Sequence, residues 1–326
     1  MSLDADSIVD RRRMRRKLTF WRTTAVIIAV LAIVGAGVVL APRAGVLRGH
    51  GAGYIARIKI EGLIRDNQER VEALDRLAKS SARAVIVHID SPGGTTAGSQ
   101  ELFDSLRALQ AKKPMVVVVD GLAASGAYIA AMSADHIIAR DTSLVGSIGV
   151  LFQFPNFSEI MKTVGIQMEE IKSSPLKAAP NGFEPTSPEA RAAIDSLVKD
   201  SYAWFKGLVK NRRHMDDEQL TRVSDGRVFT GRQAVGLKLI DALGNEKTAL
   251  AWLQSDKKVP ASTPVRDYSL KPRFGDLTFL HVAAWMFEAV GLKTLAQRTE
   301  AWSAIQAVER LNLDGLLALW HPSSSN

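Results

Sequence analysis

Strand-like and helix-like segments alternate regularly through the first half of this chain of 326 residues, and that alternation narrows its fold more than any other property. Met115 to Val119 is an unbroken apolar run rich in valine, which is typical of a central parallel strand covered on both faces. Strand, helix and strand in succession join through right-handed crossovers into a parallel sheet. The sequence therefore predicts an α/β fold, a parallel sheet with βαβ units.

Hydrophobic periodicity sets the expected element boundaries. Strands are expected at 54–60, 84–89, 115–119, 136–139, 147–151 and 166–171, and helices at 69–79, 98–111, from 125 onward, 156–164, 188–211, 218–223 and 231–236, with a closing segment at 246–253. Two turns, Ser91–Gly94 and Gly121–Ser125, follow the carboxyl ends of strands. Ligands of parallel sheets gather at those ends, so the two turns are expected to build one site.

Ser125 lies where a buried strand passes directly into a helix rich in alanine and glycine. Free backbone N–H groups and the positive end of the helix dipole lie at such a point and suit a nucleophile whose product is an oxyanion. Strand-to-helix elbows carry the nucleophile of other serine hydrolases. The alternative, a helix cap or a small residue for close packing, stays open at this point.

The composition excludes several kinds of site. The apolar share of 46% supplies a large core, and the absence of cysteine excludes disulfides, thiolate zinc sites and a cysteine nucleophile. The six histidines lack the spacing that places metal ligands on one helix face, so we expect no metal and no cofactor. They are His50, His88, His136, His214, His281 and His321.

The formal charge of +8 is concentrated before an uncharged stretch from Thr23 to Pro42. Twenty apolar residues span about 30 Å, the thickness of the hydrocarbon core, and Lys and Arg concentrate on the cytoplasmic side of membrane helices. The sequence therefore predicts a single N-terminal transmembrane helix that precedes the α/β domain. A cleaved signal peptide is the alternative, disfavoured by the length of the stretch. No aromatic residues interleave with the basic ones, so nucleic acid is not expected as a partner.

These features divide the chain into five parts. They are a basic cytoplasmic tail (1–22), a transmembrane helix (23–42), a linker (43–53), the α/β domain (54–254) and an amphipathic C-terminal extension (255–326). This topology places the α/β domain outside the cytoplasm, in the periplasm or its equivalent.

Five motifs in order resemble the bacterial signal peptide peptidase A family, serine–lysine proteases that share the crotonase-like fold with the Clp protease proteolytic subunit. The motifs are His88-Ile-Asp-Ser-Pro-Gly-Gly94, Ala124-Ser-Gly-Ala-Tyr128, Gly146-Ser-Ile-Gly-Val150, Lys172-Ser-Ser-Pro-Leu-Lys177 and Asp225-Gly-Arg-Val-Phe-Thr-Gly231. The resemblance spans residues 52–253. The segment around Lys177 departs from the glycine or aromatic neighbours that the family often has there.

The resemblance implies a role for each site residue. Ser125 would be the nucleophile, Lys177 the general base, and Ser147 the hydroxyl that orients the lysine amine. The N–H groups of Gly94 and Gly126 would bind the oxyanion. A lysine base has to be desolvated, because a free lysine amine is protonated near neutral pH.

Two other bases remain as alternatives. Lys172 precedes Lys177 by five residues, and the family pattern alone separates them. His88 and Asp90 flank the first turn, but neighbours on one strand do not readily place an imidazole between a carboxylate and a distant hydroxyl, so this pair is disfavoured.

The resemblance implies a membrane-anchored serine endopeptidase, assembled from several copies, that hydrolyses remnant signal peptides and similar apolar peptides. Two alternatives remain. One is a catalytically idle crotonase-like scaffold that binds acyl compounds or membrane partners. The other is a quality-control protease for misfolded envelope proteins.

Overall fold

The computed structural model describes residue 17 and residues 20–22, 53–270 and 317–320 of the chain. Two compact units are separated between Gly53 and Tyr54. The transmembrane helix expected at Thr23–Pro42 lies outside the described residues. Among the residues that are described, none of the helices combines the length and apolar character needed to cross a membrane.

Within the described residues, the second unit is built on a mixed sheet that is parallel at every pairing except one. The strand order is β7-β6-β4-β2-β1-β9, β5 pairs with both β4 and β8, and β6 with β7 is the antiparallel pair. The strands are β1 (Tyr54–Glu61), β2 (Ala82–Ser91), β4 (Met115–Ala124), β5 (His136–Ala139), β6 (Leu144–Gly146), β7 (Val228–Thr230), β8 (Ala242–Leu243) and β9 (Val265–Asp267). Two short strands, β3 (Gly93–Thr95) and β10 (Leu317–Leu319), pair with each other apart from this sheet.

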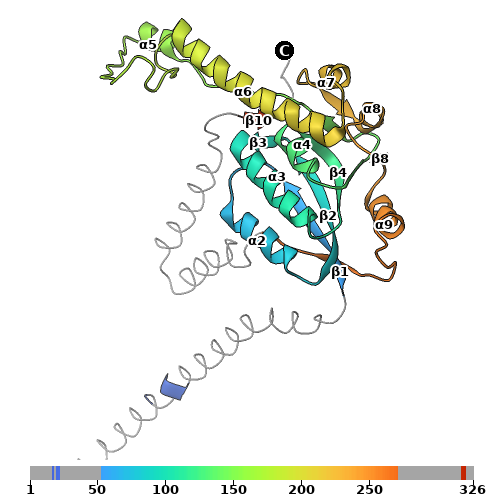
Figure 1. Cartoon of the computed structure of the whole chain (residues 1–326). Helices are drawn as coiled ribbons and strands as arrows, with labels where there is room; N and C mark the ends of the chain where they lie inside the picture. The colour runs from blue at the N-terminus through green and yellow to red at the C-terminus, as the bar shows by residue number, and fades with distance from the viewer. Residues whose placement is uncertain (1–16, 18–19, 23–52, 271–316, 321–326) are drawn as a thin grey trace, which may run out of the picture. The chain divides into compact units, whose positions relative to one another are not determined.

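The helices cover both faces of the sheet, which confirms the expected α/β architecture (Figure 1). The helices are α2 (Gln68–Ala78), α3 (Thr96–Gln110), α4 (Gly126–Ala131), α5 (Ser158–Thr163), α6 (Pro188–Arg213), α7 (Asp217–Val223), α8 (Gly231–Gly236) and α9 (Glu246–Ser255). The larger apolar core contains α2, α3, α4 and part of α6, and the smaller one, on the other face, contains α9. Valines 116–119 of β4 alternate between the two cores, as a strand covered on both faces requires.

The prediction of a strand at residues 147–151 is wrong. The strand lies earlier, at β6, and ends at Gly146, because Gly146 and Ser147 both adopt positive φ angles that break an extended run. Residues 166–171, also predicted as a strand, form no strand in the structure, and all six residues are exposed.

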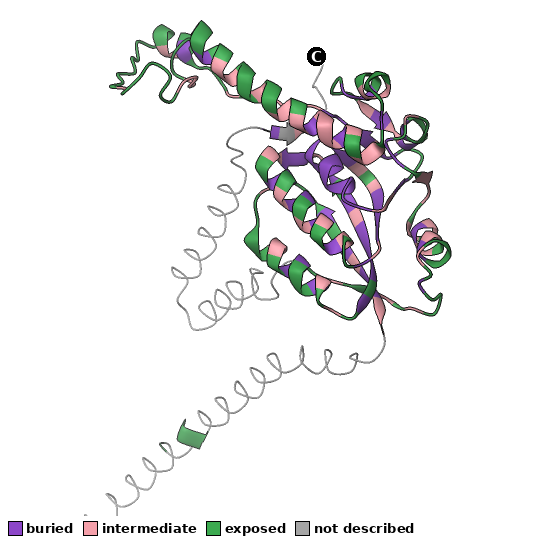
Figure 2. Ribbon diagram, viewed as in Figure 1, coloured by how far each residue is buried: buried purple, intermediate pink, exposed green. Residues whose placement is uncertain are grey.

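A projecting arm lies between β6 and α6 in the sequence. We define the arm as residues 157–187, which contain α5 and the loop that leads into α6. Figure 2 shows that the arm is largely exposed; the buried residues of α6 are Ala190 in its first turn and Phe205 and Val209 in its C-terminal half. The arm therefore contributes little to the apolar core.

Candidate active site

Ser125 forms the elbow that the sequence predicts. β4 ends at Ala124 and α4 begins at Gly126, with Ser125 between them at φ 55° and ψ −117°. Such a conformation is costly for a residue with a side chain, and residues held in it cluster at functional sites. Ser125 is 1% exposed, and its backbone N–H donates to the carbonyl of Gly146 at 2.7 Å. The sharp turn is therefore fixed by a hydrogen bond to the neighbouring strand.

The hydroxyl of Ser125 does not cap the helix that follows it. It makes no side-chain capping bond to α4. Its contact is with the carbonyl of Gly149, at 3.5 Å, which is the limit of hydrogen-bond distance. This geometry therefore does not support the capping alternative, because the hydroxyl makes no hydrogen bond to the first turn of α4.

The two turns meet at one edge of the sheet, as expected. Ser91 of β2 pairs with Ala123 of β4, so the Gly94 turn lies next to the elbow. A Cβ atom at Gly94 would overlap the carbonyl oxygen of Ile64, so this position requires glycine. Gly126 occupies the first position of α4, where a backbone N–H lacks an intrahelical acceptor. Gly94 and Gly126 therefore both lie next to the elbow that carries Ser125.

Ser147 lies on the other side of the elbow. Gly146 pairs with Ala124, and Ser147 follows with a φ of 51° and a backbone N–H that donates to the carbonyl of Arg227 at 2.8 Å. Ser147 is 7% exposed. The fold thus gathers Ser125, Gly126, Gly94 and Ser147, all of which the family resemblance named.

Lys177 is not gathered with them. It is exposed, and it lies in the arm, before the N-terminus of α6. Phe205 and Val209, which join α6 to the core around α4, lie near the opposite end of the helix. Pro188 and Phe205 are about 25 Å apart along the helix axis at 1.5 Å per residue.

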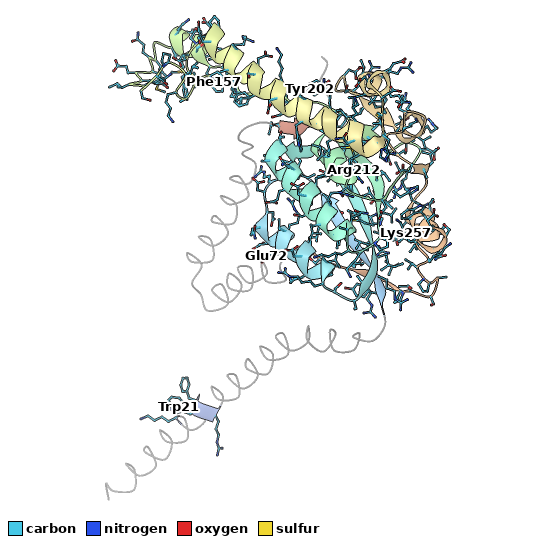
Figure 3. The ribbon with its side chains drawn as sticks, viewed as in Figure 1. Trp21, Glu72, Phe157, Tyr202, Arg212 and Lys257 are labelled. Carbon is cyan, nitrogen blue, oxygen red and sulfur yellow. The ribbon has the colours of Figure 1, made fainter. Side chains whose placement is uncertain are left out.

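Figure 3 shows how far α6 reaches: Phe157, at the start of the arm, lies beside its outer part, Tyr202 lies further along it, and Arg212 lies over the body of the domain. The prediction that Lys177 and Ser125 form a dyad therefore stays a prediction. Within one chain, Lys177 in the arm lies away from Ser125 at the end of β4.

Lys172, the competing lysine, is held by two carboxylates. Its Nζ lies 2.5 Å from Glu170 and 2.6 Å from Glu184. Its hydrogen bonds to these two carboxylates raise the pKa of Lys172 above its ordinary value. A base needs a neutral amine, so this environment favours the protonated form and disfavours Lys172 as the base.

His88 belongs to a polar network, not to a triad with Ser125. Its Nδ1 lies 2.8 Å from Asp120 and its Nε2 lies 2.9 Å from Glu246. Glu246 also accepts a hydrogen bond from Arg57. Burial raises the pKa of Glu246, but the hydrogen bonds from Arg57 and His88 outweigh it and hold the pKa below its usual range. Both ring nitrogens of His88 are thus engaged with groups other than Ser125 and Asp90.

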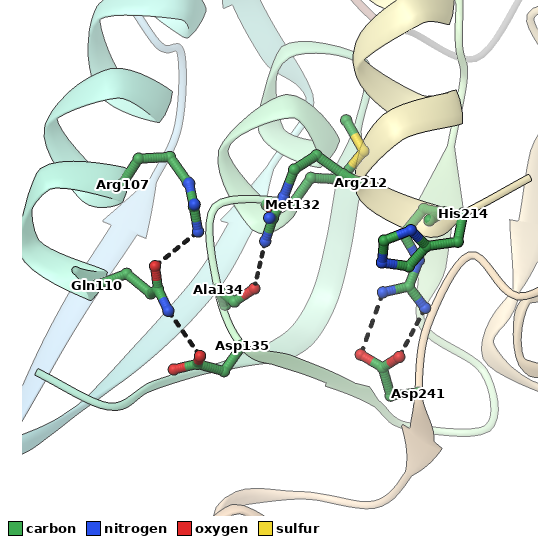
Figure 4. A pocket seen from close by; sticks show the side chains of 9 residues that line it. Arg107, Gln110, Met132, Ala134, Asp135, Arg212, His214 and Asp241 are labelled. Atoms are coloured by element: carbon green, nitrogen blue, oxygen red, sulfur yellow. Dashed lines mark hydrogen bonds and ion pairs between the residues drawn. The ribbon is translucent and has the colours of Figure 1, made fainter.

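A separate polar pocket opens between α3 and the C-terminal end of α6 (Figure 4). Arg107 donates to Gln110 and to a backbone carbonyl, Arg212 donates to two backbone carbonyls, and Arg213 pairs with Asp241. Arg107 and Arg212 thus link the C-terminal ends of α3 and α6 to residues 132–134, which follow α4. The pocket does not include Ser125 or its neighbours, and we assign it no part in the chemistry.

The sequence did not predict two features, the exposure of the arm and the pairing of β10 with β3. The apolar residues of the arm have the spacing of a buried helix or strand face, so hydrophobic periodicity alone could not show that they are exposed. The pairing of β10 with β3 joins residues more than 200 positions apart, and nothing local in the sequence indicates it.

The chain matches two family models. "Peptidase family S49" matches residues 107–260, and "Clp protease" matches residues 57–142. A putative protease of Synechocystis sp. is 36% identical over 200 residues, which cover 61% of this chain and 72% of the relative. A putative protease of Methanocaldococcus jannaschii is 32% identical over 212 residues, covering 65% and 68%. A putative signal peptide peptidase SppA of Enterococcus faecium is 27% identical over 226 residues, covering 65% and 66%.

Proposed function

The chain belongs to peptidase family S49, and we propose that it is a serine endopeptidase whose nucleophile is Ser125. The observation that carries this proposal is the strained, buried elbow at Ser125, which no capping bond explains. The hydroxyl would attack the carbonyl carbon of the scissile bond, while the N–H groups of Gly94 and Gly126 hold the resulting oxyanion. The amine product leaves, and water then hydrolyses the acyl-enzyme.

The proton of the Ser125 hydroxyl requires a base, and we assign that role to Lys177, with Ser147 orienting its amine. Lys177 would accept the proton during attack and return it to the leaving amine. Because the arm holds Lys177 far from Ser125 of the same chain, the lysine is supplied by the arm of a second copy. The site is then complete only in an assembly.

The surface of the arm supports this assignment. Large apolar side chains are exposed along it, where a solvated segment would carry polar ones. They are Phe157, Ile160, Val164, Ile166, Met168, Ile171, Leu176 and Phe183. Docking of this surface on a neighbouring copy would bury it and would remove Lys177 from water, which is the condition that a lysine base requires.

The substrates we propose are remnant signal peptides and similar apolar peptides. A relative bears the name of a signal peptide peptidase. The uncharged stretch at Thr23–Pro42 would anchor the chain in the bacterial inner membrane, with its basic tail in the cytoplasm and the peptidase domain on the other side. Neither a metal nor a cofactor has a part in these steps.

The test is cleavage of an apolar signal-peptide sequence by the full chain and by Ser125→Ala and Lys177→Met variants. Both variants should lose activity by about 10³-fold or more, because each removes a member of one catalytic unit. Ile160→Glu, on the arm, should lower activity and assembly mass together while unfolding at the wild-type temperature. Cleavage that survives both Ser125→Ala and Lys177→Met would contradict the mechanism and would favour the idle scaffold.

A further inference from the structure

The polar pocket between α3 and the C-terminal end of α6 holds more positive charge than its acids balance. Its cavity has a volume of about 360 Å³, toward the lower end of the range of small-molecule sites, about 300–1,000 Å³. Arg107 reaches into it from α3, and Arg212 and Arg213 reach into it from α6 (Figure 4). Three guanidinium groups from two helices therefore line one cavity.

Two carboxylates also line the pocket, and each already has a cation. Asp241 pairs with Arg213 at 2.8 Å, and this arginine side chain is only 12% exposed. Asp135 pairs with Lys257 at 3.3 Å and also accepts a hydrogen bond from the side-chain amide of Gln110 at 2.6 Å. Neither carboxylate is therefore left to balance a further positive charge.

Arg107 and Arg212 form no ion pair with any carboxylate of the described residues. Their partners are a side-chain amide and three backbone carbonyls, none of which carries a full charge. Burial lowers the pKa of Arg212, and the positive charges of Arg107 and Arg213 lower it further. The guanidinium groups thus repel one another, and an anion bound between them would relieve that repulsion.

Both arginines also keep N–H donors that a ligand can use. Among the described residues, nothing accepts a hydrogen bond from Nε or Nη2 of Arg107, or from Nη1 of Arg212. A guanidinium group presents paired N–H donors whose spacing matches two oxygens of a phosphate group. A phosphate that carries two negative charges would also balance both unpaired arginines, which a single carboxylate would not.

We propose that this pocket binds a phosphate group, held between the guanidinium groups of Arg107 and Arg212. The alternative is a purely structural role, in which each arginine bonds carbonyls at the end of a helix. That role does not require two guanidinium groups without acids to share one cavity. The phosphate is either a free anion or the headgroup of a phospholipid, which share this chemistry. The inference does not rest on the proposed function, because the pocket contains none of the residues assigned to peptide cleavage.

Titration calorimetry of the full chain with inorganic phosphate tests the proposal. At about pH 8 a phosphate group carries close to two negative charges, and sodium chloride is adjusted to keep the ionic strength constant. Arg107→Gln should weaken phosphate binding by about ten-fold or more, because it removes one cation and its charge-assisted hydrogen bonds. Arg76→Gln, which removes an exposed arginine from α2, is the matched control and should bind as the wild type does.

A second pair of variants leaves the arginines in place. His214 lines the pocket and follows α6 with a φ of 50°, a conformation that Asp and Asn also tolerate. His214→Asp brings a carboxylate to the guanidinium groups and should weaken phosphate binding by about ten-fold. His214→Asn adds no charge and should bind as the wild type does. This pair decides the question even if Arg107→Gln fails to fold.

A second probe distinguishes the two sources of phosphate. A phosphatidic acid with acyl chains short enough to keep it soluble should bind at least about ten-fold more tightly than inorganic phosphate if the site takes a lipid headgroup, because its acyl groups add apolar contacts. Equal affinity for the two probes would identify a free phosphate as the ligand. Failure of the wild-type chain to bind either probe would overturn the proposal, and so would binding that is unchanged in both Arg107→Gln and His214→Asp.

Discussion

Replacing Gly94 with alanine should damage both folding and catalysis. A Cβ atom at this position would overlap the carbonyl oxygen of Ile64 and would lie 2.7 Å from its backbone nitrogen. These atoms cannot move freely, because Ile64 accepts a hydrogen bond from Thr95 at 2.9 Å and donates one to Gly93 at 2.8 Å. The turn must therefore shift, and both hydrogen bonds must lengthen or break.

The expected magnitudes follow from these contacts. Overpacking costs about 1–3 kcal/mol, and two hydrogen bonds contribute about 1 kcal/mol each. The free energy of unfolding should therefore fall by about 3–5 kcal/mol. Displacing the N–H of Gly94 removes one oxyanion donor, which should lower kcat by about 10²- to 10³-fold.

Urea unfolding measures the first quantity, and peptide cleavage well below the unfolding midpoint measures the second. Gly207→Ala in α6 is the matched control, since a Cβ atom there meets nothing within 4 Å. It should leave kcat unchanged and should stabilise the helix by at most about 1 kcal/mol. A Gly94→Ala variant that keeps the wild-type kcat would refute the role of this N–H.

Three further predictions concern other residues. Lys172→Met should keep peptide-cleavage activity within about two-fold, because Lys172 is paired with two carboxylates, whereas Lys177→Met should abolish it. Equal losses of activity in the two variants would contradict the choice of Lys177 over Lys172 as the base. Tyr128→Phe should lower the free energy of unfolding in urea by about 1–3 kcal/mol, because it leaves the buried carbonyl of Leu239 without its 2.7 Å hydrogen bond. Burial lowers the pKa of His136, so its stabilising contribution is complete above the pKa of an unfolded histidine, about 6.5, and is lost as the pH falls below it. His136→Gln should accordingly flatten the decrease of Tm between pH 7 and pH 5, and an unchanged slope would contradict this origin.

The central layers of the fold could be predicted from local pattern. The run at 115–119 is apolar on both faces and became the strand between two cores, and His136–Ala139 and Gly231–Gly236 were predicted to the residue. The elbow at Ser125 followed from the abrupt change between a strand pattern and a helix pattern. These features depend on residues close together in the sequence.

The parts that were not predicted depend on distant contacts. β9 and β10 are three residues long and acquire their hydrogen bonds from β1 and β3, so their own residues carry little signal. The arm shows apolar spacing without burial, so its exposed apolar residues could not be told from a core face by local pattern. The resemblance named Lys177, but no local pattern could indicate that α6 would carry it away from Ser125.

The most direct test of the proposed site is complementation between two inactive variants. Ser125→Ala and Lys177→Met chains are co-expressed with different tags, and assemblies that carry both tags are purified and assayed. If each site combines Ser125 of one copy with Lys177 of its neighbour in a cyclic assembly, random mixing restores about a quarter of the wild-type sites. We predict that recovery. Mixed assemblies that remain as inactive as either parent would contradict a site shared between copies.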